Sequence, residues 1–408
     1  MDVHIHRSTT HRKSSLTITG SKSESNRALL LQALYPQVSI ENVSNSDDSV
    51  LMKKALVAKD DHIDIHHAGT AMRFLTAYFS IQEGRDVILT GSSRMKERPI
   101  KILVDALRDL GADIAYLENE GFPPLRIKGK KLVNSRVTLK ANVSSQYISA
   151  LLLIASRLGD GLELTLDGMI TSVPYIKMTL SLLDQLGIEN SFEGGTIVVK
   201  PFSPKFESKT IVVESDWSSA SYYYSIIALS DLDTEITLST YKNESLQGDS
   251  VLAEVYQAFG IETIFRSNAI TLRKAAIIDE TSSIRFDLSN APDIAQTIAV
   301  TAFGLGLECY LTGLHTLKIK ETDRLVALKT ELEKLGAEVS ITEATLHLKP
   351  AETINGNISI ATYNDHRMAM AFAPLGLKTT LHIQNADVVS KSYPQFWKDL
   401  SAVGFRLK

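Results

Sequence analysis

The segment ELEKLGAEV, residues 331–339, ends an amphipathic helix and recurs along the chain in recognisable copies. Leucines follow one another at helical spacing from Leu325 to Leu335, and Gly336 then provides the left-handed residue that commonly stops a helix. A strand pattern follows the glycine. The other copies are ALRDLGADI (106–114), LLDQLGIEN (182–190), VYQAFGIET (255–263) and, more weakly, DLSAVGFRL (399–407).

A second pattern precedes each copy, namely a shorter, almost wholly apolar helix followed by a strand. A helix that is apolar on every side has to be buried, and the amphipathic helix beside it must face solvent. The glycines of the four strong copies are 76, 73 and 76 residues apart, which indicates a repeated unit of buried helix, strand, amphipathic helix and hairpin. The six apolar helices and their strands are predicted within residues 25–40, 71–91, 145–166, 219–238, 293–313 and 367–383.

These units predict an α/β fold of two lobes, each an inside-out barrel of three repeated units with helices inside and sheets outside. The third unit ends near residue 214, so we expect residues 21–214 to form one lobe. The other lobe would combine residues 1–20 with residues 215–408. An open solenoid is the alternative, but the motifs that carry charge fall at unequal places in the units and would not make a repeating surface.

Composition narrows the class of protein. The 408 residues contain 43 Lys and Arg against 47 Asp and Glu, so the chain lacks the positive charge that a nucleic acid would require. Cys309 is the only cysteine, which excludes an internal disulfide and fits a reducing cytoplasm. The N-terminal segment has no apolar signal region, and no segment is apolar for the length of a bilayer. We therefore expect a soluble, cytoplasmic protein.

Basic residues gather in short motifs where an apolar strand gives way to a helix. Unpaired backbone N–H groups and the helix macrodipole make such helix starts attractive to anions. The motifs together predict one site for a small phosphorylated or carboxylated substrate. They are GSKSESNR (20–27), HAGTAMR (67–73), RMKERP (94–99), KETDR (320–324) and NDHR (364–367).

Two motifs in the first half have alternative interpretations. GSKSESNR lacks the glycine spacing of a nucleotide P-loop, and Ser23 and Ser25 could simply cap a helix. Lys22 and Arg27, on either side of the helix start, favour anion binding instead. RMKERP, which is predicted to form a loop ahead of a helix with Pro99 in its first turn, is equally consistent with a solvated charge run.

KETDR is the sharper motif. We expect Lys320 to end an apolar strand, with Glu321 and Arg324 three residues apart at the following helix start. Thr322 or Asp323 could cap that helix, and the motif could then be only a cap with a surface ion pair. A carboxylate held between a lysine and an arginine is also typical of a proton-transfer group.

Other polar residues precede predicted helices. Asp293 stands at the entrance of a buried helix, as a cap or as a functional carboxylate. His62 and His66 share one face of a predicted strand, but two imidazoles without further ligands make a zinc site improbable. Hydroxyl and amide groups at equivalent places in the repeats suggest a lined pocket, and they are Ser144, Ser145, Gln146, Ser172 and Tyr175.

Eight motifs, in order from residue 20 to residue 373, resemble the 5-enolpyruvylshikimate-3-phosphate synthase family. The resemblance covers nearly the whole chain, and the fold of that family is two lobes of three repeated units. The motifs are GSKSESNRALL, AGTAMR, LTGSSRMKERPI, SSQYISALL, SVPYIKMTL, DWSSASYY, IKETDRL and NDHRMAMAFA.

The resemblance implies transfer of the enolpyruvyl group of phosphoenolpyruvate to the 5-hydroxyl of shikimate 3-phosphate, with release of phosphate. The reaction passes through a tetrahedral adduct and requires neither a metal nor an organic cofactor. Two small-molecule substrates are the implied partners, and we expect a monomer that binds neither nucleic acid nor membrane.

The resemblance also implies roles for individual residues. Asp293 would take the proton of the attacking hydroxyl, and Glu321 would deliver and later remove the proton at the methylene carbon, with Lys22 as a further catalytic group. Phosphoenolpyruvate would be held by Lys22, Arg94, Arg324, Arg367 and Lys391, with Gly69 packed close to it. Shikimate 3-phosphate would be held by Ser23, Arg27, Ser144, Ser145, Gln146, Ser172, Tyr175 and Lys320.

Three positions depart from the usual pattern of that family, namely Thr19, His67 and Thr316. They bear on substrate affinity and inhibitor sensitivity more than on the reaction. The related transferase that acts on UDP-N-acetylglucosamine is the closest alternative, but it carries a cysteine in a mobile loop, and the only cysteine here lies in a predicted buried strand. A catalytically inactive, metabolite-sensing scaffold is the other alternative, and the presence of both predicted catalytic carboxylates argues against it.

Overall fold

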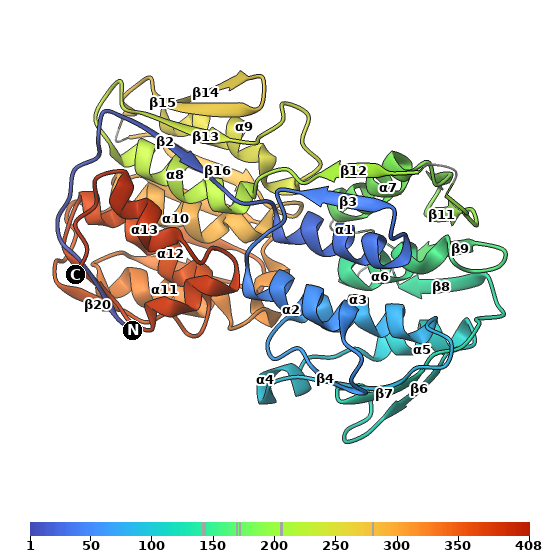
Figure 1. Ribbon diagram of the computed structural model, residues 1–408. Coiled ribbons are helices and arrows are strands. Elements are labelled where there is room, and N and C mark those ends of the chain that lie inside the picture. The colour runs from blue at the N-terminus through green and yellow to red at the C-terminus, as the bar shows by residue number, and fades with distance from the viewer. Residues whose placement is uncertain (141–143, 169, 171–172, 205–206, 280) are drawn as a thin grey trace. The chain divides into compact units, whose positions relative to one another are not determined.

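Apolar helices form the interior of the protein, as the sequence predicts. A computed structural model describes residues 1–408 apart from 141–143, 169, 171–172, 205–206 and 280 (Figure 1). Over these residues, all six predicted apolar helices are present, and their side chains are almost entirely buried. They are α1 (Lys22–Leu34), α3 (Gly69–Ser80), α6 (Ser145–Ala155), α8 (Trp217–Leu229), α10 (Ala295–Gly304) and α12 (His366–Phe372).

Amphipathic helices accompany the apolar ones, and each has one buried and one exposed face. The copy at residues 255–263 is the exception, because α9 covers only Leu252–Val255 before the chain tightens into a 3₁₀ turn at Tyr256–Phe259. The other members are α2 (Asp47–Val57), α5 (Lys101–Asp109), α7 (Val173–Leu186), α11 (Arg324–Lys334) and α13 (Phe396–Ala402), and a short extra helix is α4 (Ser93–Lys96).

The repeated glycines act as the sequence predicts. Gly111, Gly187, Gly260, Gly336 and Gly404 all have positive φ, between 75° and 115°. In this left-handed region a residue with a side chain is disfavoured, so glycine ends each helix and turns the chain into the next strand.

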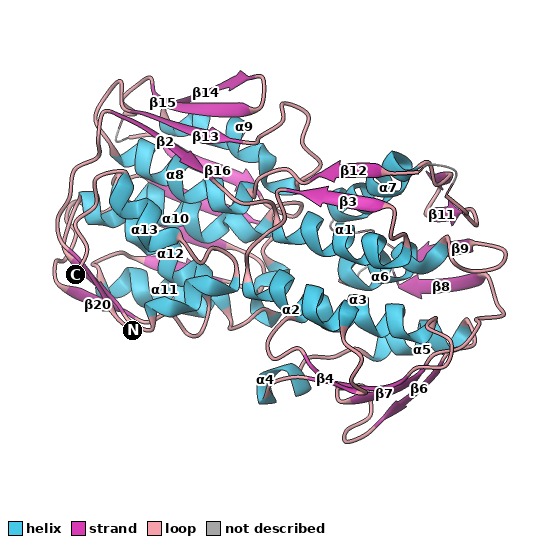
Figure 2. Cartoon of the chain, viewed as in Figure 1, coloured by secondary structure: helices cyan, strands magenta, loops and turns pink. Residues whose placement is uncertain are grey.

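Contacts between residues divide the chain into two compact units. One is the continuous segment Gly20–Val213, and the other combines Met1–Thr19 with Glu214–Lys408. Each unit has its own hydrophobic core. The elements of each unit are coloured by secondary structure in Figure 2, where the strands run along the outside of the helices. The inside-out α/β prediction is therefore confirmed.

Strands of the first unit, Gly20–Val213, form three sheets in the described residues. β4 pairs in parallel with β5, and β8 with β9, before antiparallel hairpins complete these two sheets. The strands are β3 (Val38–Glu41) with β12 (Lys209–Val212); β4 (His62–Asp64), β5 (Asp86–Thr90), β6 (Asp113–Tyr116) and β7 (Leu125–Lys128); and β8 (Arg136–Lys140), β9 (Leu162–Asp167), β10 (Asn190–Glu193) and β11 (Thr196–Val199).

The second unit repeats this plan, with the N-terminal strands completing sheets that belong to the C-terminal half. β2 pairs in parallel with β13, and β1 pairs antiparallel with β21. The strands are β2 (Lys13–Thr17), β13 (Glu235–Ser239), β14 (Ile261–Arg266) and β15 (Ala269–Lys274); β16 (Ser283–Asp287), β17 (Glu308–Thr312), β18 (Val339–Ile341) and β19 (Leu346–Leu348); and β1 (Val3–Ile5), β20 (Ile358–Ile360) and β21 (Leu381–Ile383).

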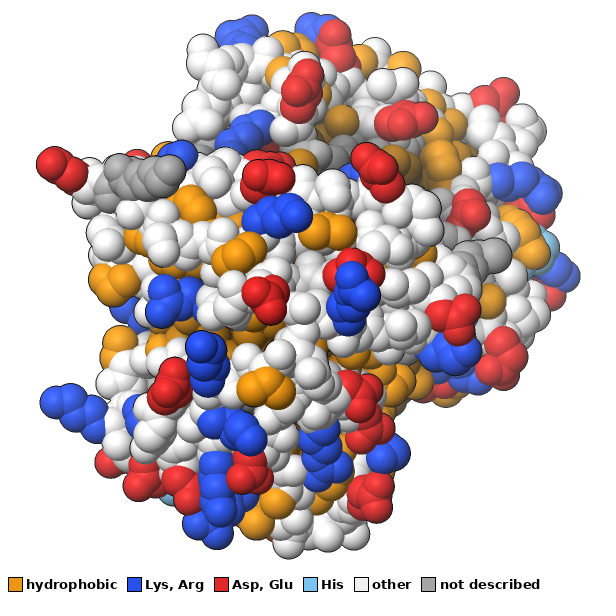
Figure 3. Space-filling view, turned by 90° about the vertical axis from the view of Figure 1, so that its right-hand side faces the viewer, with side chains coloured by type: hydrophobic (Ala, Val, Ile, Leu, Met, Phe, Trp, Pro, Cys, Tyr) orange, Lys and Arg blue, Asp and Glu red, His pale blue; other side chains and the backbone are white. Residues whose placement is uncertain are grey.

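The surface carries charges of both signs. Figure 3 shows one face, on which Lys and Arg side chains alternate with Asp and Glu rather than forming a continuous basic area. In the described part of the chain, no helix is long and apolar enough to span a bilayer.

Candidate functional site

A buried arginine at the start of α11 is the centre of a charged network in the second unit. Asp323 caps α11 by accepting hydrogen bonds from the backbone N–H groups of Leu325 and Val326, each at 3.2 Å. The helix therefore begins at Arg324, whose side chain is only 2% exposed. Of the two capping candidates in KETDR, the structure selects Asp323.

Arg324 gathers carboxylates from three parts of the chain. Its Nε donates to Asp365 Oδ2 at 2.6 Å, its Nη1 to Asp293 Oδ1 at 2.8 Å and its Nη2 to Glu321 Oε2 at 2.8 Å. Burial alone would lower the pKa of Arg324, but these carboxylates, with Asp365 first, raise it above its usual value. The guanidinium thus stays charged and fixes both predicted catalytic carboxylates on one group.

Asp293 also contacts two other cations. Its carboxylate lies 3.3 Å from Lys320 Nζ and 3.2 Å from Arg367 Nη2, and its side chain is 18% exposed. Burial by itself raises the pKa of Asp293, but Arg367, Lys320 and Arg324 together hold it well below the usual value. The carboxylate is therefore ionised at neutral pH.

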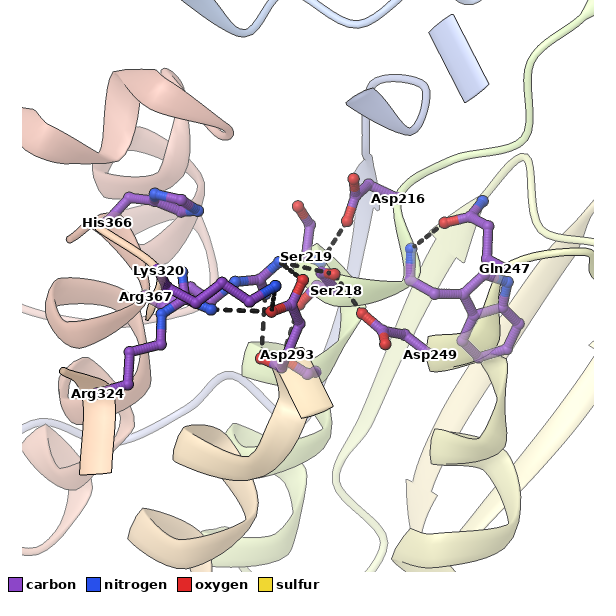
Figure 4. A network of polar contacts seen from close by, with 12 residues as sticks. Asp216, Ser218, Ser219, Gln247, Asp249, Asp293, Lys320, Arg324, His366 and Arg367 are labelled. Carbon is purple, nitrogen blue, oxygen red and sulfur yellow. Dashed lines mark hydrogen bonds and ion pairs between the residues drawn. The ribbon is translucent and has the colours of Figure 1, made fainter. Parts of the chain in front are cut away.

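Arg367 lies at the start of α12, where Asp365 accepts a hydrogen bond from its backbone N–H at 2.9 Å. Its Nη1 donates to the Asp293 backbone carbonyl at 3.2 Å, and its Nη2 also donates to Ser218 Oγ at 3.2 Å. Figure 4 shows Arg324, Lys320 and Arg367 approaching Asp293 from one side.

The network continues to a second buried carboxylate. Ser218 Oγ donates to Asp249 Oδ2, and Asp249 is 3% exposed. Burial first, and then the charge of Asp293, raises the pKa of Asp249 to about 6. Sequence reasoning missed Asp249 and Ser218, since neither stands in a basic motif.

Lys391 and Asn364 connect this network to the last 3₁₀ turn. Lys391 ends the turn Ala386–Lys391, and its Nζ donates to the Asn364 backbone carbonyl at 2.6 Å. The structure also brings four predicted site residues together, because Asp293 directly contacts Lys320, Arg324 and Arg367. Asp365 was missed as a site residue, although it belongs to the NDHR motif.

In the first unit, Arg27 is buried in the second turn of α1. Its guanidinium donates to Thr179 Oγ1 and Ser149 Oγ at 2.8 Å and to the Ser23 carbonyl at 2.7 Å. Its Nη2 lies 3.4 Å from the Tyr175 carbonyl. Burial lowers the pKa of Arg27 to about 10, which leaves it charged at neutral pH. Arg27 therefore connects α1 with α6 and α7 through Ser149 and Thr179.

Gly69 opens α3 and lies against a guanidinium. A Cβ built at Gly69 would come 2.4 Å from Arg98 Nη1, so only glycine leaves Arg98 in its present place. Arg73, on the same helix, is buried and donates to the Pro99 carbonyl at 2.9 Å. Burial first, and then Arg98, lowers the pKa of Arg73 to about 10.

The remaining predicted ligands of this unit are more exposed. Gln146 Nε2 donates to Thr70 Oγ1 at 3.3 Å and so connects the starts of α6 and α3. Ser144 caps α6 through the Gln146 N–H at 3.4 Å, next to Ser145, the first helical residue. Arg94 is 57% exposed and forms an ion pair with Glu97 at 2.8 Å. Ser172 lies outside the described residues.

Several local predictions were wrong. Lys320 follows a 3₁₀ turn, His315–Ile319, rather than a strand. Arg94 and Lys96 lie in the short helix α4, and Pro99 precedes α5 instead of lying in its first turn.

The alternative interpretation of GSKSESNR, in which Ser25 only caps α1, is not supported, because Ser25 Oγ accepts a hydrogen bond from the Ser44 N–H at 2.8 Å. One further local prediction was wrong. β4 ends at Asp64, and His66 lies in a turn with a φ of 49°, so it does not share a strand face with His62.

The described cations and carboxylates of the second unit allow two kinds of chemistry. Lys320 and Arg367 can bind phosphate or carboxylate oxygens, and Asp293 and Glu321 can accept or deliver protons. Among the described residues, no group of His, Cys, Asp and Glu has an arrangement that could hold a metal ion.

Comparison with known proteins agrees with these features. The pattern of EPSP synthase (3-phosphoshikimate 1-carboxyvinyltransferase) matches residues 52–400. A 3-phosphoshikimate 1-carboxyvinyltransferase of Bacteroides fragilis is 46% identical over 400 residues, which cover 97% of this chain and 96% of that protein. One of Histophilus somni is 35% identical over 421 residues, covering 95% and 96%.

Solved structures share the fold. EPSP synthase of Acinetobacter baumannii superposes with a TM-score of 0.82 at 20% identity, covering 100% of this chain and 99% of that one. An enolpyruvyl transferase of Streptomyces tendae does so with a TM-score of 0.76 at 13% identity, covering 100% and 98%. With the match to the family pattern and the relatives above 30% identity, the chain belongs to the EPSP synthase (3-phosphoshikimate 1-carboxyvinyltransferase) family.

Proposed function

We propose that this protein transfers the enolpyruvyl group of phosphoenolpyruvate to the 5-hydroxyl of shikimate 3-phosphate, giving 5-enolpyruvylshikimate 3-phosphate and phosphate. Membership of the family supports this reaction. The observation that carries the proposal is that Asp293 and Glu321 both lie 2.8 Å from nitrogens of the buried Arg324. The proton of the attacking hydroxyl and the protons at the methylene carbon are exchanged at different atoms, and two neighbouring carboxylates can serve these two places.

We assign the removal of the hydroxyl proton to Asp293. In this structure Arg367, Lys320 and Arg324 lower the pKa of Asp293, so its carboxylate is a weak base. Substrate phosphate and carboxylate groups that bind Lys320 and Arg367 would draw these cations away from Asp293. Its pKa would then rise, and Asp293 would become a stronger base only when substrates are bound.

We assign the proton transfers at the methylene carbon to Glu321. It is more exposed than Asp293, at 27% against 18% for the side chain, and it touches a different nitrogen of Arg324. The carbon of phosphoenolpyruvate must first accept a proton and then lose one, so a carboxyl group that both donates and accepts is required. Addition followed by elimination of phosphate through a tetrahedral adduct completes the reaction.

The proposed substrate ligands follow the chemistry of the two substrates. Two phosphates and a carboxylate call for fixed cations, and the hydroxyls of shikimate 3-phosphate call for polar side chains. For phosphoenolpyruvate we propose Lys22, Arg94, Arg324, Arg367 and Lys391, with Gly69 close by and Lys22 also assisting catalysis. For shikimate 3-phosphate we propose Ser23, Arg27, Ser144, Ser145, Gln146, Ser172, Tyr175 and Lys320.

The sister reaction on UDP-N-acetylglucosamine is less well supported. The cysteine of the chain, Cys309, is buried in β17, and burial raises the pKa of its thiol to about 12. Such a thiol is protonated at neutral pH. Because Cys309 lies in a buried strand, it cannot correspond to the loop cysteine of the sister family.

A phosphate-release assay with each acceptor tests the function. We expect turnover with phosphoenolpyruvate plus shikimate 3-phosphate and none with UDP-N-acetylglucosamine. Asp293→Asn should slow turnover and weaken shikimate 3-phosphate, while Asp323→Asn, which changes only the helix cap beside the site, is the control. If phosphate is released with UDP-N-acetylglucosamine as acceptor but not with shikimate 3-phosphate, the proposed reaction is wrong. If neither acceptor gives turnover, the protein only binds these metabolites.

We further propose that the protein works as a monomer in the cytoplasm. The single cysteine of the chain, Cys309, is free and buried, which is compatible with a reducing compartment. Light scattering across a range of protein concentrations should give the mass of one chain, 44.9 kDa.

A further inference from the structure

The loop before α12 has an unusual backbone. Tyr363 and Asn364 are consecutive and both left-handed, with φ of 54° and 55°. Asparagine tolerates this region, but for a bulky residue such as tyrosine it is a genuine outlier. The loop leads directly to Asp365 and Arg367, which contact Arg324 and Asp293. Something outside the loop must therefore hold this conformation.

Glu331 of α11 holds the loop from one side. Its side chain is fully buried, at 0% exposure. Oε1 accepts from the Tyr363 phenol at 2.6 Å, and Oε2 accepts from the Ala361 backbone N–H at 3.2 Å. Lys334 Nζ lies 2.7 Å from Oε2 and balances the buried charge. A buried carboxylate with this many partners orders the groups that it touches.

Glu331 and Arg324 act from the same face of α11. They are seven residues apart, close to two full turns, so both side chains point to the same side of the helix. Arg324 binds Asp365 at 2.6 Å, at the end of the loop, and Glu331 binds Ala361 at its beginning and Tyr363 at its middle. One face of α11 therefore binds both ends of the five-residue loop 361–365.

We propose that Glu331 is a positioning residue, which acts through Tyr363 to hold the loop 361–365 in the shape that presents Asp365 and Arg367 to the active site. This inference rests on the proposed role of Arg367 in binding phosphoenolpyruvate. Neither Glu331 nor Tyr363 belongs to the assigned substrate ligands. Both act at a distance, through the backbone that leads into α12.

The Tyr363 phenol remains a donor throughout the working range of pH. Burial first, and the neighbouring Glu331 carboxylate second, raise the pKa of Tyr363 to about 12. Loss of the bond should therefore come from mutation and not from titration near neutral pH. The phenol is also partly exposed, at 38% for the residue, so removal of its oxygen leaves no buried cavity.

The test compares Tyr363→Phe, Glu331→Gln and the double variant with wild type in steady-state kinetics on both substrates. We expect Tyr363→Phe to raise the KM for phosphoenolpyruvate about tenfold, the usual worth of a hydrogen bond to a charged group, and to leave the KM for shikimate 3-phosphate within about twofold. Glu331→Gln leaves only one side-chain oxygen for the two donors Tyr363 O–H and Ala361 N–H, so it weakens the same connection that Tyr363→Phe removes. The loss in the double variant should therefore be smaller than the sum of the two single losses.

Controls separate positioning from folding. Tyr310→Phe removes a phenol from β17 of the same unit, next to His347, and should leave both KM values unchanged. Urea unfolding of every variant shows whether the enzyme assayed is folded. Should Glu331→Gln fail to fold, Tyr363→Phe alone still decides the question.

Arg367→Lys, measured in parallel, distinguishes the inference from its premise. If Arg367→Lys leaves the KM for phosphoenolpyruvate unchanged, the proposed role of Arg367 is wrong. If Arg367→Lys raises that KM but Tyr363→Phe does not, or if the effects of Tyr363→Phe and Glu331→Gln simply add, the positioning role of Glu331 is refuted.

Discussion

At the scale of single residues, Arg324 explains why the carboxylates of this site stay in place. A buried guanidinium is costly unless its charge is matched, and Asp365, which is fully buried, provides the match at 2.6 Å. The remaining nitrogens then hold Asp293 and Glu321 at 2.8 Å. Asp365 thus stabilises the buried charge of Arg324, and the more exposed carboxylates of Asp293 and Glu321 remain accessible to substrates.

Replacement of Glu321 by glutamine should separate binding from chemistry. The amide keeps the shape and can still accept a hydrogen bond from Arg324, but it cannot exchange a proton with carbon. We expect turnover to fall by about two to four orders of magnitude, the usual worth of a positioned acid or base, while both substrates still bind. Calorimetry and turnover on Glu321→Gln check this prediction. A turnover rate near that of wild type would show that Glu321 is not the proton-transfer group and that KETDR acts only as a helix cap.

Asp249 should make stability depend on pH in an unusual direction. Its pKa is raised to about 6, so between about pH 4 and pH 6 the folded protein keeps a proton that the unfolded chain has released. The contribution of Asp249 to the free energy of unfolding therefore falls as pH rises through this interval and stays low above it.

Asp249→Asn removes this titration and should raise the free energy of unfolding at pH 7.5 by about 1–3 kcal/mol, with little gain at pH 4.5. Urea unfolding of wild type and variant at both pH values measures the difference. Asp105→Asn, at a side chain that is 44% exposed, is the control. An equal change at both pH values would show that Asp249 is not the titrating group.

At the scale of elements, the starts of buried helices carry the proposed ligands, and Gly69 at the start of α3 lies directly against an arginine side chain. Gly69→Ala places a methyl group 2.4 Å from Arg98 Nη1, so the Arg98 guanidinium must move. The family resemblance implies that glyphosate binds in place of phosphoenolpyruvate, and we expect the variant to weaken glyphosate more than phosphoenolpyruvate, because a packed pocket has no spare volume. Inhibition constants and KM values measured together test this, and an equal loss for both would contradict the placement of Gly69.

Elements were predicted well where the signal was local. The glycine stops and the apolar helices were visible in the sequence, because helix ends and wholly buried helices have their own composition. The short α9 was not predicted, since Leu252–Val255 retains the apolar spacing of a longer helix. The turn at His66 was missed for a similar reason, as the strand pattern continues past Asp64.

Partners far apart in the sequence could not be predicted in this way. Arg324 and Asp365 are 41 residues apart, and Ser218 and Asp249 are 31 apart, so only the folded chain brings them together. The motif KETDR indicated a held carboxylate but not which groups hold it. The basic motifs predicted an anion site, and the family resemblance assigned its residues to the two substrates, whereas Asp249 offered no signal of either kind.

At the scale of the whole molecule, the two units differ in how the chain builds them. The unit Gly20–Val213 is continuous, and its core contains residues from Ala28 to Val213 only. All strands of its sheets also come from this segment. A segment with its own core and with completed sheets satisfies the requirements of an independent domain.

We therefore expect residues 20–213, produced alone, to fold and to bind shikimate 3-phosphate. Seven of the eight proposed ligands lie in this segment, and only Lys320 is absent, so binding should be about 10- to 100-fold weaker than in the full chain, the worth of one charged hydrogen bond. The segment should have no turnover, because Asp293 and Glu321 are absent. Calorimetry on the segment, with Ser23→Ala as a weakened control, measures the affinity, and circular dichroism during urea unfolding shows whether the segment folds cooperatively. If the segment does not fold, the argument from separate cores is wrong. If it folds but does not bind shikimate 3-phosphate, the main ligands of this substrate belong to the other unit.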